Sequence, residues 1–281
     1  MTRVLLTGGS GFIATHILKL LLERGHSVVT TVRSPTKAED IKKTYPNIGS
    51  DRLDFAIVPD IAKASAFDEV IQSDPPFEAV VHTASPFTFN VTDIKRDLLD
   101  PAINGTIGIL YAIKKKAPQV KRVVGHGSLA YWCGFMQQLT ARVQVITSSF
   151  ASMMDGSKGL WPGHTYSEKD WNPITAEQAL ENPRVGYPAS KTFAEKAAWD
   201  FITNEKPGFT LATILPPLVF GPAVQSLSSL KELNTSNQFI FSFTAGAAKD
   251  GIPPTTNPLF VDVRDVAFAH VKAIETAEAG S

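Results

Sequence analysis

Residues 7–14 read TGGSGFIA, and this glycine-rich stretch decides the fold. It follows a strand-like apolar segment and opens a segment with helical apolar spacing, Phe12–Glu23. In the GxxGxxA pattern Gly8 makes the tight turn, Gly11 lets the backbone approach a pyrophosphate, and Ala14 allows close helix–strand packing. The first helical N–H groups then face the phosphates. An ordinary glycine-rich turn is the alternative, but the place of the motif at the first strand-to-helix junction favours nucleotide binding.

Strand-like and helical segments alternate along the chain. The predicted strands are Arg3–Thr7, Ser27–Val32, Phe55–Val58, Ala79–Thr83, Val120–Val124 and Phe209–Leu215, and the predicted helices include Phe12–Glu23, Leu98–Lys116 and Tyr187–Thr203. Continuous apolar strands that alternate with helices favour a parallel sheet covered on both faces. We therefore predict an α/β protein with a Rossmann doubly wound parallel sheet.

The end of the second predicted strand indicates which dinucleotide binds. NAD enzymes usually carry an acidic residue there for the ribose 2′-OH. Here Arg33 follows the strand, with Lys37 close behind. A cation suits a 2′-phosphate, which favours NADPH, although both residues could simply be solvated surface charges. Asp60 could accept a hydrogen bond from the adenine amino group, or it could be a turn residue after Pro59.

Two Tyr-x-x-x-Lys pairs occur in the chain. Tyr111 and Lys115 lie in a lysine-rich run that is typical of a solvated helix face, so we interpret this pair as structural. Tyr187 and Lys191 follow the predicted strand end at Ser149. A spacing of four places Tyr187 and Lys191 on one helical face, although an amphipathic surface helix would show the same spacing.

The second pair fits carbonyl reduction. Tyr187 can protonate the nascent alkoxide, Ser149 can hold the carbonyl oxygen, and Lys191 can tune the phenol. A phenol titrates near ~10, so bringing it towards neutrality requires roughly 4 kcal/mol. A cation about 4 Å away supplies about that much at an effective dielectric constant of ~20. We therefore expect Lys191 to lower the pKa of Tyr187.

Composition excludes several other classes of protein. The 281 residues are 43% hydrophobic and 19% charged, with 27 basic and 27 acidic residues, which gives no indication of nucleic acid or an anionic membrane as partner. Cys133 is the single cysteine, so no internal disulfide can form. With neither a signal peptide nor a bilayer-spanning stretch in the sequence, we expect a cytoplasmic protein, monomeric or homodimeric, without a bound metal.

Longer motifs resemble the extended short-chain dehydrogenase/reductases. Within this family, the chain resembles the subgroup of dihydroflavonol reductases, cinnamoyl-CoA reductases and the yeast methylglyoxal/3-methylbutanal reductases. The match covers nearly the whole chain and includes TGGSGFIA, VPDI at 58–61, HTASPF at 82–87, DLLDPAINGT at 97–106, ITSSFAS at 146–152, YPASKTFAEKAAW at 187–199, PPLVFGP at 216–222, LNTS at 233–236 and FVDVRDVAFAH at 260–270.

The resemblance implies specific roles for residues of this chain. It implies Ser149, Tyr187 and Lys191 as the catalytic triad, with a small-molecule carbonyl as substrate. For NADPH/NADP+ it places Tyr187 and Lys191 at the reacting end, Val219 beside the nicotinamide and Ser236 near the phosphates. The residues that it implies around the adenosine and phosphates are Gly8, Gly9, Ser10, Gly11, Phe12, Ile13, Arg33, Lys37, Asp60 and Ile61. Asn104 would be structural or anchor a water relay, and Phe87, Phe150 and Met153 would shape the substrate pocket or simply pack in the core.

The chain departs from the resemblance in two places. Gly125–Val145 interrupts what should be one buried strand, and we hypothesise that it is a short in-frame intron read as coding sequence. A surface loop is the alternative, and Val143–Thr147 could then replace Val120–Val124 in the sheet. The chain also ends at Ser281, so we expect an NADP-binding Rossmann domain at 1–220 and a small, incomplete C-terminal substrate lobe at 221–281, with a helix returning to the core.

Three functions compete. The leading prediction is hydride transfer from NADPH to an aldehyde or ketone. A nucleotide-sugar epimerase is disfavoured by Arg33, because such enzymes typically retain NAD. A catalytically impaired, NADP-binding isoform or regulator is the third possibility, supported by the insertion and the short C-terminus and opposed by the intact Tyr187 and Lys191.

Overall fold

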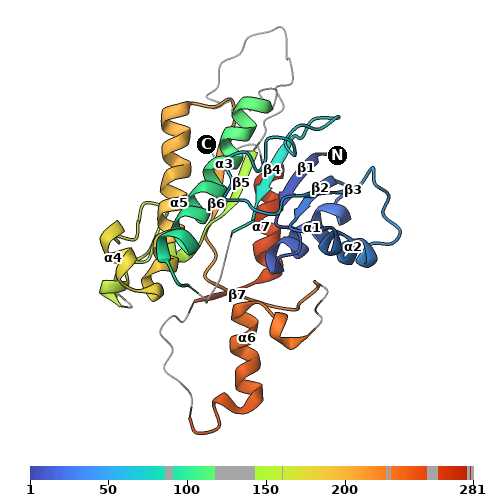
Figure 1. Ribbon diagram of the computed structural model, residues 1–281. Coiled ribbons are helices and arrows are strands. Elements are labelled where there is room, and N and C mark those ends of the chain that lie inside the picture. Colours follow the sequence, from blue (N-terminus) through green and yellow to red (C-terminus); the bar gives the residue numbers. More distant parts are fainter. Residues whose placement is uncertain are drawn as a thin grey trace, which may run out of the picture.

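The computed structural model describes residues 1–85, 91–117, 143–159, 161–225, 227, 229–251, 259–276 and 279 (Figure 1). Its strands are β1 (Arg3–Thr7), β2 (Ser27–Val32), β3 (Leu53–Ile57), β4 (Ala79–His82), β5 (Val143–Thr147), β6 (Thr210–Ile214), β7 (Leu218–Phe220) and β8 (Phe260–Asp262). Its α-helices are α1 (Phe12–Glu23), α2 (Pro35–Thr44), α3 (Asp100–Lys116), α4 (Ala176–Glu181), α5 (Pro183–Glu205), α6 (Thr235–Ser242) and α7 (Val263–Glu275), with short 3-10 or π turns between some of them.

Six strands form one parallel sheet in the order β3-β2-β1-β4-β5-β6. This is the order of a doubly wound dinucleotide-binding fold, so the predicted fold class is confirmed. The order reverses between β1 and β4, and ligands bind at the carboxyl ends of strands that flank such a reversal.

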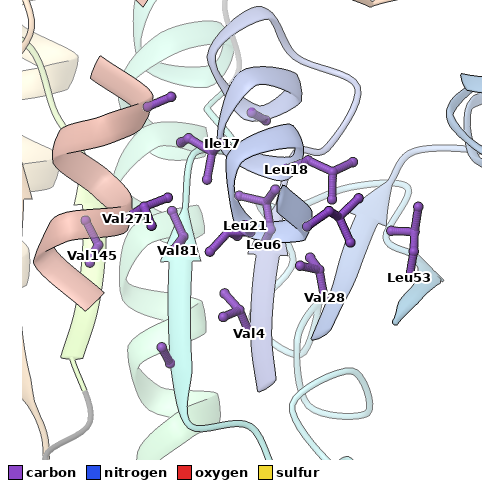
Figure 2. Close-up of a cluster of buried hydrophobic side chains, with 14 of the residues drawn as sticks. Val4, Leu6, Ile17, Leu18, Leu21, Val28, Leu53, Val81, Val145 and Val271 are labelled. Carbon is purple, nitrogen blue, oxygen red and sulfur yellow. The ribbon is translucent and has the colours of Figure 1, made fainter. Parts of the chain in front are cut away.

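Both faces of the sheet are buried, as its continuous apolar strands require. In β1, Val4 and Leu6 point to one face and Leu5 to the other, and all three are fully buried. Residues of α1, α2 and α7 cover the first face (Figure 2), while α3 and α5 cover the second (Figure 1). Val271 of α7 lies in the first core, so the last helix packs beside the first one.

Several predicted boundaries shift. β3 begins at Leu53, two residues before the prediction, because Leu53 and Asp54 already pair with β2. The helix that was predicted from Tyr187 begins at Pro183, since proline suits the first helical position, and it runs through Pro188. A π-helical turn, Lys95–Leu99, precedes α3.

The fifth strand is Val143–Thr147, which was the alternative that the sequence offered. The predicted strand Val120–Val124 lies outside the described residues, as does most of the Gly125–Val145 segment.

The chain after β6 forms a second, two-stranded parallel sheet from β7 and β8, with α6 beside β7 (Figure 1). Within the residues that the structure describes, no helix has the length and apolarity to cross a membrane.

Candidate active site

The turn after β1 is shaped by its glycines. Gly8 has φ +74, a conformation that side chains disfavour, and its carbonyl accepts a hydrogen bond of 2.8 Å from Gly11 N–H. A Cβ on Gly9 would lie 2.0 Å from Thr30 Oγ1, so only glycine fits against β2. Gly11 is the N-cap of α1 and has no side chain to cover the first-turn N–H groups. This turn therefore fits the diphosphate of a dinucleotide.

The residues expected around the 2′-phosphate lie beside this turn. Gly8 N–H donates to Thr31 Oγ1 at 3.1 Å, which fixes the glycine turn to the end of β2. Arg33 and Lys37 follow that end and are exposed, and Lys37 lines the same small pocket as Ser10. Two exposed cations at this position suit a phosphorylated ribose.

Two expected cofactor residues, Asp60 and Ile61, follow β3, and they make different contacts. Asp60 Oδ1 accepts a hydrogen bond of 2.9 Å from Ala62 N–H, which is the turn geometry that the sequence left as an alternative. Ile61 packs against Gly105 of α3, where a Cβ would come within 3.1 Å of Ile61 Cδ1.

A buried histidine joins the two strands at the reversal of the sheet order. His82 Nδ1 lies 2.9 Å from Thr7 Oγ1, and the same hydroxyl accepts from Ala84 N–H at 3.1 Å. Burial, and secondarily the charge of Lys191, lower the pKa of His82 to about 3, so His82 is neutral at physiological pH.

Ser149 follows β5 on a turn that continues the pairing with the chain after β6. The flanking N–H groups of Ser148 and Phe150 donate to Ile214 and Pro216 carbonyls at 2.8 and 3.0 Å. Ser149 Oγ accepts from Ala151 N–H at 3.2 Å. The Ser149 side chain also hydrogen-bonds Tyr187 of α5, so the structure brings together two of the three residues expected to act in catalysis.

The third residue, Lys191, lies on the same helix, and its ammonium group hydrogen-bonds the segment after β4. Lys191 Nζ donates to Ser85 Oγ at 3.0 Å and lies 5.9 Å from the centre of the Tyr187 ring. Burial raises the pKa of Tyr187, and the hydrogen bond with Ser149 offsets this only in part. The net shift of the Tyr187 pKa is therefore upward and not towards neutrality, because burial dominates.

Lys191 is itself perturbed. Burial lowers the pKa of Lys191 by more than the nearby Glu195 carboxylate raises it, and the net pKa is about 8. The other pair, Tyr111 and Lys115, lies on the outer side of α3, where Tyr111 is 37% exposed.

The remaining expected residues lie in several places. Val219 packs with Phe12 at the start of α1, and Ser236 Oγ donates to the Val219 carbonyl, which docks α6 onto β7. Met153 is buried and Phe150 contacts Tyr166, whereas Phe87 lies outside the described residues.

Sequence reasoning missed several buried polar groups around Lys191. Asn104 is exposed on α3, and the small cavity beside Lys191 is lined instead by Thr106 of α3 together with His82, Ser85 and Glu195. His82 and Ser85 belong to the HTASPF motif, whose polar residues at a strand end were the available signal.

The sheet order and the glycine turn define a dinucleotide-binding protein of the Rossmann class. Residues 4–151 match the sequence profile described as the NAD dependent epimerase/dehydratase family. The chain belongs to this family.

Similar proteins are reductases. A ketoreductase of Aspergillus niger is 47% identical over 279 residues, and an NADPH-dependent methylglyoxal reductase of Saccharomyces cerevisiae is 39% identical over 279 residues. Each alignment covers 98% of this chain and 75% of the relative. The crystal structure of yeast methylglyoxal/isovaleraldehyde reductase with NADPH matches with a TM-score of 0.84 and 38% identity, over 99% of this chain and 76% of that one.

Proposed function

We propose that this chain reduces an aldehyde or ketone to an alcohol with NADPH. One observation carries the proposal: Ser149 hydrogen-bonds Tyr187, one helical turn from Lys191, on the carboxyl side of the sheet where the glycine turn lies. The ketone and methylglyoxal reductases among the relatives support a small carbonyl compound as substrate.

The chain's own residues account for the proton in this reaction. When bound, NADPH supplies the hydride that adds to the carbonyl carbon. Ser149 holds the carbonyl oxygen, and Tyr187 passes its hydroxyl proton to that oxygen as it becomes an alkoxide. The raised pKa of Tyr187 keeps this hydroxyl protonated before the reaction. An alkoxide is far more basic than a phenolate, so the transfer is downhill, and the charge of Lys191 stabilises the phenolate that forms.

The cofactor is held by the glycine turn, residues 8–13, and by the two cations beyond β2. Arg33 and Lys37 bind the 2′-phosphate and select NADPH over NADH. We place Asp60 and Ile61 at the adenosine, Val219 at the nicotinamide and Ser236 near the phosphates. The support is the position of each residue after its strand and the resemblance of its motif.

The test is NADPH oxidation by the purified chain with a panel of small aldehydes, ketones and diketones, repeated with NADH. We expect turnover with NADPH, and an Arg33→Ala variant that loses affinity for NADPH but not for NADH. Binding of NADPH without turnover of any substrate would favour the catalytically impaired isoform or regulator instead. We further propose a cytoplasmic monomer or homodimer, on the support of its cysteine usage and balanced charge.

A further inference from the structure

A carboxylate is buried next to the proposed catalytic residues. Glu195 of α5 is only 5% exposed. Its Oε2 atom accepts a hydrogen bond from Ser148 Oγ and lies 2.6 Å from Ser152 Oγ. These two serines stand on either side of Ser149, so one carboxylate holds the turn that presents Ser149.

The same carboxylate belongs to the helix that carries the other two residues. Tyr187, Lys191 and Glu195 follow one another at intervals of four, which places them along one face of α5. Ser152 Oγ also lies 2.8 Å from the carbonyl of Ser149. Glu195 therefore connects two elements whose separation sets the distance between the Ser149 and Tyr187 hydroxyls.

A buried carboxylate is retained only where hydrogen bonds and an opposite charge compensate its desolvation. Lys191 supplies the charge, and the two serines supply the hydrogen bonds. Lys191 and Glu195 both line a cavity of about 20 Å³, which is large enough for one water molecule.

Other titratable groups face this pair. His82 of β4 lines the cavity from the sheet and is neutral. On the far side of Glu195, Glu168 and Asp170 line a separate cavity of about 250 Å³. Asp170 pairs with His164 at 2.9 Å and accepts from Ser167. Among the described groups that line the two cavities, Lys191 is the only cation facing Glu195.

We propose that Glu195 is a positioning residue for carbonyl reduction, acting as the clamp between the Ser149 turn and α5 and as the buried counter-ion of Lys191. This inference rests on the proposed function. Its two parts are separable, because glutamine keeps an acceptor oxygen while it removes the charge, and alanine removes both.

The first experiment measures kcat/KM for NADPH-dependent reduction against pH. We expect kcat/KM of the wild type to decline at alkaline pH as Lys191 loses its proton, and this decline is the alkaline limb of the profile. In Glu195→Gln the alkaline limb should move by roughly one pH unit towards lower pH, because Lys191 loses the neighbouring charge that raises its pKa. Glu168→Gln removes a neighbouring carboxylate that does not bond the turn, and it should leave the limb in place. Ser152→Ala should lower kcat without moving the limb. An unmoved limb in an active Glu195→Gln variant overturns the counter-ion role.

The second experiment needs no turnover. Hydrogen–deuterium exchange of the cofactor-free protein should show faster exchange at residues 148–152 in Glu195→Ala than in the wild type, and near-wild-type exchange in Glu195→Gln. Equal exchange in all three proteins overturns the clamp. If the wild type reduces no carbonyl, the proposed function fails while the clamp is still tested. The thermal unfolding midpoint of each variant verifies that it is folded.

Discussion

The ammonium of Lys191 donates a hydrogen bond of 3.0 Å to Ser85 Oγ, and this contact joins α5 to the segment that follows β4. It aims the charge at the point where the sheet order reverses. Because Lys191 is buried there, its pKa falls to about 8, close to neutral pH. The protonation of this lysine then decides how well a phenolate at Tyr187 is stabilised.

A pH profile tests this consequence. Lys191 carries its charge below about pH 8 and loses it above, so kcat/KM should decline on the alkaline side with an apparent pKa near 8. Lys191→Arg should move this limb out of the measurable range, because arginine keeps its charge. A profile that is flat to pH 10 in the wild type would contradict the assignment.

The glycine turn makes a second prediction. Gly9→Ala places a Cβ 2.0 Å from Thr30 Oγ1, so the turn must shift. We expect the free energy of unfolding to fall by about 1–3 kcal/mol and the Kd for NADPH to rise roughly tenfold or more. Denaturant unfolding and NADPH fluorescence measure the two effects.

Two variants serve as controls for Gly9→Ala. Gly108→Ala on α3 meets its nearest neighbour at 3.9 Å and should be neutral or slightly stabilising. Adding Thr30→Ala to Gly9→Ala removes the clashing hydroxyl and should restore part of the NADPH affinity. A Gly9→Ala protein with wild-type stability and affinity would show that the close approach to β2 is not needed.

Gln144 makes a third prediction. It is 2% exposed in β5 and paired between Val80 and Leu211, and both polar atoms of its side chain are buried without a hydrogen-bond partner among the residues that the structure describes. An unsatisfied buried amide is costly, so Gln144→Val should raise the free energy of unfolding by about 1–3 kcal/mol. Urea unfolding measures the change, and a loss of stability would mean that the amide has a function.

The same residue bears on the hypothesis of a retained intron. Deleting 125–145 joins Val124 to Ile146 and places Val123 at the strand position that Gln144 occupies. We expect the shortened chain to be more stable than the full one for the same reason as Gln144→Val. Sequencing the transcript tests the hypothesis itself: a dominant message that contains the codons for 125–145 contradicts it.

The sheet and its glycine turn were predictable because their signals are local. The TGGSGFIA stretch fixes a turn by backbone conformation, and apolar runs such as that of β1 can be buried only inside a covered sheet. The places of Ser149, Tyr187 and Lys191 in the fold were predictable because each stands at a definite strand end or helix position.

The electrostatics of the site were not predictable in the same way. The sequence spacing of Tyr187 and Lys191 does not reveal that Lys191 bonds Ser85, 106 residues earlier in the chain. Burial raises the pKa of Tyr187 and lowers that of Lys191, and burial depends on packing between distant elements. Glu195 was hidden for this reason too, since its partners come from the turn after β5.

The most direct measurement compares two matched phenylalanine variants, Tyr187→Phe and Tyr111→Phe, one from each Tyr-x-x-x-Lys pair. Tyr187→Phe should lower kcat for NADPH-dependent carbonyl reduction by about 10²–10⁴-fold while the protein stays folded and binds NADPH. Tyr111→Phe loses only a contact of 3.4 Å with Glu205 on the outer side of α3 and should retain wild-type kcat. Equal activity of the two variants would contradict the claim that Tyr187 is the proton donor.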